Sequence, residues 1–160
     1  MTNDELVQLA RDLAAIAASV TQKYREMEQM RKSSTKENKM KITIETIPHD
    51  KQRYDTVGDW QFDEENLNIK VSEIPTSGHG YYELLIGIHE LVEAILCKNQ
   101  GVTEQQVDDW DLTHGKDPGN NPECPYYRQH LLATVIENIL ANELGVDLID
   151  YEISLNRLSK

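Results

Sequence analysis

The stretch Gly80-Tyr-Tyr-Glu-Leu-Leu-Ile-Gly-Ile-His-Glu-Leu-Val-Glu-Ala-Ile-Leu-Cys97 decides the fold of this chain. It is mostly apolar, it is long enough for a helix, and its central polar residues are His89, Glu90 and Glu93. Residues four apart share a helix face, so His89 and Glu93 lie together on a face that is otherwise apolar. Burying an imidazole and a carboxylate there costs free energy, which a bound divalent metal offsets.

Glu90 follows the first of these residues and lies about 100° further around the helix. The segment has the spacing of the zinc-protease motif His-Glu-x-x-His, with Glu93 in place of the second histidine. In that motif the glutamate beside the first ligand is the general base, so Glu90 is the candidate catalytic residue. A histidine and a glutamate four apart also form structural hydrogen-bonded pairs at the edge of a core. The sequence leaves both interpretations open.

A second helix, predicted over Tyr126–Glu143, offers further ligands, because a zinc site usually needs three or four. His130 and Glu137 are seven apart, two turns along one face of this helix. We expect His89, Glu93 and His130 to bind Zn²⁺ or another divalent cation. Glu137 is then a fourth ligand or a partner that orients His130. The aliphatic residues predicted as the core of this helix are Leu131, Leu132, Val135, Ile136, Ile139 and Leu140.

A long loop, residues 112–122, separates these two helices and is rich in polar residues. His114, Asp109, Asp111 and Asp117 lie on it or beside it. Such a loop either covers a site or is simply solvated, and the sequence does not choose between these two roles.

Strand-like segments precede the first long helix. Residues 40–47, Thr56–Phe62 and Leu67–Ser72 are rich in β-branched and aromatic residues, and Asp63–Asn66 is a candidate hairpin turn. A short helix is predicted after Thr103, and another over residues 147–158. The order of these elements predicts an α+β domain over residues 40–160, with a small antiparallel sheet followed by packed helices.

The N-terminal segment, residues 1–30, carries a heptad pattern with steps of three and four. Its seam positions are Leu6, Leu9, Leu13, Ile16, Val20, Lys23, Met27 and Met30. The pattern favours a coiled coil that assembles a dimer or another small homo-oligomer, and the alternative is an amphipathic helix that packs on its own domain. Residues 31–39 contain no apolar residue and are predicted to be a flexible linker.

The charge of the chain is unevenly distributed. Residues 1–39 carry seven Lys and Arg against six Asp and Glu, whereas residues 40–160 carry nine against twenty-two, a net charge of −13. So acidic a domain repels nucleic-acid backbones, so we expect no nucleic-acid binding. We also expect no membrane span, because no apolar run is long enough, and a cytoplasmic location, because the polar N-terminus is not a signal peptide. The two cysteines, Cys97 and Cys124, are too few for a disulfide framework.

Several runs of this chain together resemble a family of small, uncharacterised phage and prophage proteins. They are Met40-Lys-Ile-Thr-Ile-Glu-Thr-Ile-Pro48, Val57-Gly-Asp-Trp60, His89-Glu-Leu-Val-Glu-Ala94, Pro125-Tyr126 and Glu143-Leu-Gly-Val146. More distantly, strands that lead into a His-Glu-x-x-Glu helix and then a second ligand-bearing helix resemble minimal zincin metallopeptidases. Those enzymes carry a second histidine where this chain has Glu93. The resemblance implies a zincin-like fold and a phage-type, zinc-dependent hydrolase, and it does not indicate the substrate.

Two alternatives stand beside this hydrolase. Glu90-x-x-Glu93 resembles half of the magnesium site of all-helical nucleotide pyrophosphohydrolases, but those enzymes lack the preceding strands and the partner motif Glu-x-x-Asp is missing here. The other alternative is a non-catalytic phage protein that inhibits a host defence protein or sequesters nucleotides. In that case the polar residues of the two helices form a structural cluster or a vestigial site.

Overall fold

The computed structural model describes residues 21–27, 40–75, 81–115 and 118–158. The chain divides into two compact units, residues 1–39 and 40–160. In the first unit the described residues 21–27 are helical. Most of the predicted coiled-coil seam and the predicted linker lie outside the described residues, so self-association through the N-terminal helix stays a prediction.

The second unit begins with a three-stranded mixed sheet of β1 (Ile42–Ile47), β2 (Gly58–Asp63) and β3 (Asn66–Ser72), in the order β1-β3-β2. β2 and β3 form the predicted antiparallel hairpin, with Asp63 paired with Asn66. β1, however, pairs with β3 in parallel. The prediction of a purely antiparallel sheet is therefore wrong.

The connection between β1 and β2 explains the mixed sheet. It contains the 3₁₀ helix η1 (His49–Lys51) and carries the chain to the opposite edge of the sheet, so that β3 enters between the two earlier strands. β3 takes the centre because its Leu67, Ile69 and Val71 are fully buried. Side chains on an edge strand are less covered, and Ile42 and Ile44 of β1 are indeed exposed.

Four α-helices of this unit follow the sheet: α2 (Tyr81–Gln100), α3 (Glu104–Asp111), α4 (Tyr127–Glu143) and α5 (Leu148–Asn156). The predicted capping box of α3 is present, because the side chain of Thr103 accepts from the backbone N–H of Gln106 and the Gln106 side chain accepts in return. α5 has the side chain of Asp147 as its N-cap. Each end satisfies backbone groups that the first helical turn leaves unpaired.

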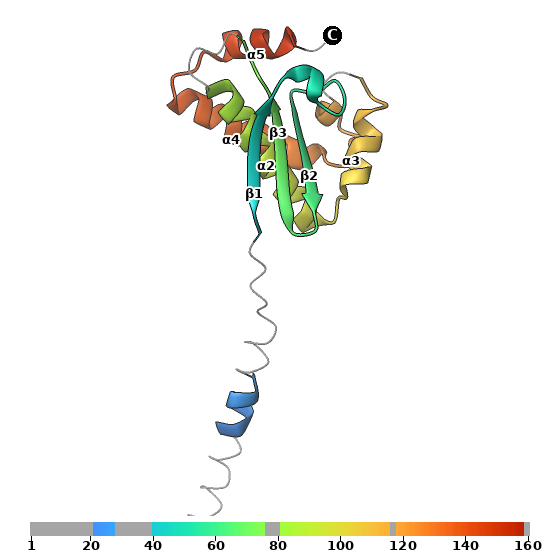
Figure 1. Cartoon of the computed structure of the whole chain (residues 1–160), viewed down its shortest axis with the longest axis vertical. Coiled ribbons are helices and arrows are strands. Elements are labelled where there is room, and N and C mark those ends of the chain that lie inside the picture. Colours follow the sequence, from blue (N-terminus) through green and yellow to red (C-terminus); the bar gives the residue numbers. More distant parts are fainter. Residues whose placement is uncertain (1–20, 28–39, 76–80, 116–117, 159–160) are drawn as a thin grey trace, which may run out of the picture. The chain divides into compact units, whose positions relative to one another are not determined.

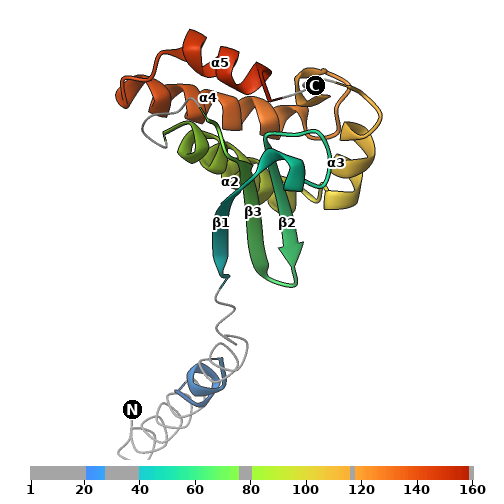
Figure 2. The ribbon, with the colours of Figure 1, turned by 45° about the horizontal axis from the view of Figure 1, so that its top comes forward.

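The layers of the domain place α2 at its centre (Figures 1 and 2). α2 packs on the sheet through β2 and β3 and on α4 through its other side, while α5 lies on α4. α3 lies near the β2 edge of the sheet (Figure 1). The hydrophobic core therefore forms around α2, which contributes Leu85, Ile86, Ala94 and Cys97. Any polar residue on the inner face of α2 must find its partners within this core.

The orientation of α4 reverses most of the prediction made for it, because of the six predicted core residues Leu140 alone packs against the core. The predicted core residues Leu131, Leu132, Val135, Ile136 and Ile139 are exposed, with 39–60% of their surface accessible. The buried face is Gln129, Ala133, Glu137 and Ala141. Two alanines allow α4 to approach a neighbouring helix closely, and His130 and Glu137 meet polar partners of α2 there. The polar contacts of this face and the small size of its alanines determine that it is the buried face of α4, and hydropathy does not.

Both cysteines are free and buried. Burial raises the pKa of the Cys97 thiol to about 12 and that of the Cys124 thiol to about 11. Within the described part of the chain, no helix combines the length and the apolar character that crossing a membrane requires.

Candidate metal centre

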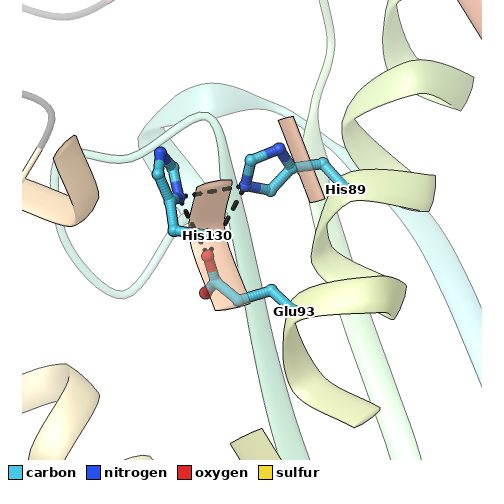
Figure 3. Close-up of side chains that lie close together, drawn as sticks. All are labelled: His89, Glu93 and His130. Atoms are coloured by element: carbon cyan, nitrogen blue, oxygen red, sulfur yellow. Dashed lines mark hydrogen bonds and ion pairs between the residues drawn. The ribbon is translucent and has the colours of Figure 1, made fainter. Parts of the chain in front are cut away.

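Three side chains from two helices converge at one point in the core (Figure 3). His89 and Glu93 come from α2 and His130 comes from α4. His130 Nδ1 lies 2.9 Å from Glu93 Oε2 and 3.2 Å from His89 Nε2, and His89 Nε2 lies 3.5 Å from Glu93 Oε2. The three potential ligand atoms lie within 4.8 Å of one another. Two imidazoles and a carboxylate at this separation are a donor set that suits zinc and related cations.

The outer nitrogen of His89 is held by a buried carboxylate. Glu137 Oε2 lies 2.7 Å from His89 Nδ1, and Glu137 Oε1 accepts a hydrogen bond of 2.5 Å from the hydroxyl of Tyr151. Both oxygens of Glu137 are therefore engaged away from the three converging atoms. Glu137 orients His89, where the sequence had suggested a fourth ligand or a partner of His130. A carboxylate on Nδ1 directs the Nε2 atom of the same ring toward a metal.

The carboxylate of Glu93 is positioned from the sheet. Trp60 on β2 donates its indole N–H to Glu93 Oε1 at 3.1 Å, and Oε2 of the same carboxylate faces the two histidines. Nothing in the sequence pattern pointed to Trp60 as a supporting residue, because an apolar aromatic on a strand is a normal core residue.

His130 is covered by the second 3₁₀ helix, η2 (Pro118–Asn120), from the polar loop between the helices. A Cβ atom at Gly119 would lie 2.6 Å from His130 Cγ, so only glycine fits at this contact. η2 is fixed in turn by the indole of Trp110, which donates to the carbonyl oxygen of Pro118 at 3.1 Å. The loop thus covers the site, one of the two roles that the sequence left open.

The other predicted loop residues are divided by the fold. His114 stacks on Trp110 at a centroid distance of 3.5 Å and is exposed, so it lies apart from the three converging side chains. Asp111 accepts hydrogen bonds from Tyr126 and Tyr54 and lines a pocket beside the site. Asp117 lies outside the described residues.

Burial and neighbouring opposite charges shift the pKa of His89 and that of Glu93. Burial lowers the pKa of His89, but its hydrogen bonds with Glu137 and Glu93 outweigh that effect and raise the pKa to about 10. Burial likewise raises the pKa of Glu93, while hydrogen bonds with His130 and His89 lower it to about 2. Without an ion, His89 therefore carries a second proton at neutral pH, and a metal at this point takes the place of that proton.

Glu90 faces a small acidic pocket next to the three converging side chains. The pocket volume is about 20 Å³, room for a water molecule. A Cβ atom at Gly58 would lie 2.7 Å from Glu90 Cγ, so the glycine of β2 makes space for this side chain. Six carboxylates line the pocket: Asp59, Glu90, Glu93, Glu104, Asp108 and Asp111.

Only part of this negative charge is balanced by a cation among the described residues. Arg53 donates to both oxygens of Asp59 at 2.7 Å and to both oxygens of Asp108 at 2.8 and 2.9 Å.

Burial, and then the charge of Glu93, raise the pKa of Glu90 well above its usual range. Burial also raises the pKa of Asp111 to about 6. A general base works best with a pKa near the working pH, and raising the pKa of a carboxylate moves it in that direction.

A second polar constellation resembles a catalytic triad without being one. His49 Nδ1 lies 3.0 Å from Ser72 Oγ, and His49 Nε2 lies 3.2 Å from Asp55 Oδ1. Ser72, however, is completely buried, and its hydroxyl also accepts from Gln52 Nε2 at 3.1 Å. No substrate reaches that hydroxyl, so these contacts fasten η1 to the end of β3.

Comparison with known proteins adds no functional assignment to this geometry: no family model, no curated protein and no solved structure matches the chain.

Proposed function

We propose that the domain of residues 40–160 is a metal-dependent hydrolase whose cation is held by His89, Glu93 and His130. The observation that carries this proposal is the convergence of two imidazole nitrogens and one carboxylate oxygen within 4.8 Å. Zn²⁺ is the cation that this mixture of nitrogen and oxygen donors suits best. Three protein ligands leave a fourth position of a tetrahedral ion open, which is the arrangement of catalytic sites.

The chain supplies the remaining parts of a hydrolytic site. A divalent cation held there contributes Lewis acidity and lowers the pKa of nearby water. Glu90 is the general base in this proposal, because it follows the first ligand in sequence and lines the water-sized pocket beside the second. Glu137 and Trp60 hold the ligands His89 and Glu93 by hydrogen bonds.

The lining of the pocket bears on the class of substrate. Its six carboxylates face a single guanidinium, that of Arg53, among the residues that line or border it in the described chain. Glu90 has a raised pKa and Glu93 would be a ligand of the cation, so the remaining excess of negative charge comes from the other four carboxylates. That excess favours a neutral or cationic group over an anionic phosphoester. A peptide or another amide therefore fits this site better than a phosphoester does.

The phage origin and the zincin-like architecture are part of the same proposal. The phage origin rests on the sequence resemblance alone. The zincin-like architecture is supported by the order of elements, since a β-hairpin leads into the ligand helix α2 and a second ligand helix, α4, follows. Glu93 departs from the zincin pattern, but a carboxylate oxygen is also an ordinary ligand of zinc.

One observation favours a non-catalytic protein as the second candidate. The polar groups of the site satisfy one another without an ion, through contacts of 2.7–3.2 Å among His89, His130, Glu93 and Glu137. A satisfied buried network is stable as a structural element. In this candidate the domain is a phage protein that binds a host or phage partner.

Metal analysis separates the two candidates. The protein is purified without a metal-affinity tag and its metal content is measured, together with that of His89→Ala. We expect about one zinc per chain in the wild type and little in the variant. The matched control is His114→Ala, which removes an exposed histidine outside the site and should keep its metal. A folded wild-type protein that binds no added zinc rejects the hydrolase.

A further inference from the structure

We propose that Tyr151 of α5 is a positioning residue of the metal centre and couples the docking of α5 to metal binding. This inference rests on the proposed function, because it needs a metal at His89. The inference goes beyond the proposed function by assigning a role to the C-terminal helix, which supplies none of the three ligands.

The contact runs through two hydrogen bonds in series. The Tyr151 hydroxyl donates to Glu137 Oε1 at 2.5 Å, and Glu137 Oε2 lies 2.7 Å from His89 Nδ1. All three side chains are buried, with 2%, 9% and 9% of their surface accessible. Hydrogen bonds to a buried carboxylate are short and strong, because the charge is poorly screened there.

The hydroxyl of Tyr151 fixes the rotation of the Glu137 carboxylate. A carboxylate with one engaged oxygen is free to turn about its last side-chain bond, whereas Glu137 is held at both oxygens. In that orientation it accepts from His89 Nδ1 and leaves His89 Nε2 facing Glu93 and His130. Tyr151 therefore acts on the ligand through Glu137, as outer partners do in zinc sites.

The same residue anchors its helix. Tyr151 and Ser154 are the buried residues of α5, and the ring of Tyr151 packs edge-on against Tyr82 of α2 at a centroid distance of 4.9 Å. If docking of α5 strengthens metal binding, metal binding strengthens the docking of α5 by the same coupling free energy. Metal at His89 should therefore stabilise the docking of α5, and loss of the Tyr151 hydroxyl should weaken metal binding.

The test uses the full chain and zinc alone as the probe. Zinc affinity is measured by competition with a chelator for the wild type and for Tyr151→Phe, and folding of the metal-free proteins is checked by circular dichroism. We expect Tyr151→Phe to bind zinc roughly 10-fold more weakly, with a preserved spectrum. The matched control Tyr82→Phe removes a hydroxyl from the other ring of the aromatic pair and should bind zinc like the wild type.

Hydrogen exchange provides a second readout. We expect zinc to slow amide exchange over residues 148–156, and we expect Tyr151→Phe to lose most of that protection. Equal zinc affinity in wild type and Tyr151→Phe, or an α5 whose exchange ignores zinc, overturns this inference while the hydrolase stands. A wild type that binds no zinc overturns both.

Discussion

The indole N–H of Trp60 donates to Glu93 Oε1 at 3.1 Å, so a strand of the sheet holds the carboxylate whose other oxygen faces His89 and His130. The two oxygens of Glu93 thus have different partners. One is fixed by a neutral donor in the core, and the other is available to a cation. This division makes Trp60 an internal reporter for the state of the site.

Trp60 should report zinc binding by its fluorescence. Metal at Glu93 changes the charge next to the indole, so we expect added zinc to change the emission of the wild type and of Trp110→Phe. Trp60→Phe should lose most of this response and bind zinc more weakly, because Glu93 loses a buried hydrogen bond. Equal responses in the two variants would contradict this role of Trp60.

Glu90→Gln should separate catalysis from metal binding. The substitution keeps the shape of the side chain and removes its basicity, so we expect unchanged zinc content and complete loss of any amide hydrolysis. Metal content is measured by elemental analysis and hydrolysis with neutral and cationic peptide substrates. Loss of zinc in Glu90→Gln would instead make Glu90 a ligand.

Gly119→Ala should displace His130 while leaving the chemistry of all three proposed ligands unchanged. The added methyl group would lie 2.6 Å from His130 Cγ, so the ring or η2 must move. We expect roughly 10-fold weaker zinc binding, as for a displaced outer partner. The control is Gly87→Ala, whose methyl group would meet Ile44 at 3.0 Å on the sheet side of α2. That variant should keep the zinc affinity. Unchanged zinc affinity in Gly119→Ala would show that η2 does not position His130.

Zinc affinity should rise with pH. The pKa of His89 is raised from 6.5 to about 10 in the metal-free fold, so the ion must displace a proton at neutral pH. We expect the apparent dissociation constant to fall by up to roughly tenfold per pH unit between about pH 6 and pH 8. The proton on His89 stabilises the metal-free fold fully below pH 6.5, and this contribution is lost as the pH rises toward 10. A pH-independent affinity would place the metal elsewhere.

A chain that begins at Met40 should fold alone and be monomeric. Residues 40–160 form a compact unit of their own, and the predicted heptad lies in the part removed. Light scattering on the full chain and on the shortened chain tests this, with circular dichroism as the check of folding. An unchanged oligomer would place the interface in the acidic domain, and an unfolded product would make the first helix part of its core.

The sequence predicted the site better than it predicted the surfaces around it. His89 and Glu93 were assigned to one face because helical spacing is a local rule, and His130 followed because a ligand set needs a third member. Glu137 lies beside the three converging side chains, but it contacts His89 and not His130. Its partner depends on how far α4 is rotated about its axis, which spacing within one helix cannot give.

The reversed face of α4 shows the limit of hydropathy most clearly. Leu131, Val135 and Ile139 form as regular an apolar stripe as any core helix, yet this stripe faces away from α2. A buried imidazole and carboxylate need specific partners, and here His130 meets Glu93 of α2 while Glu137 meets His89 of α2 and Tyr151 of α5. The parallel pairing of β1 could not be predicted from the strand pattern for a similar reason. It depends on the path of the connection through His49.

The two buried thiols can report how often the packing around α2 opens. Cys97 lies one turn beyond Glu93 on the helix that carries two of the ligands, and Cys124 lies just before α4. Because burial keeps both sulfurs protonated and covered, a thiol reagent modifies a molecule only while the packing around α2 is transiently lost. The rate of labelling at these two cysteines therefore measures how often the two ligand helices separate.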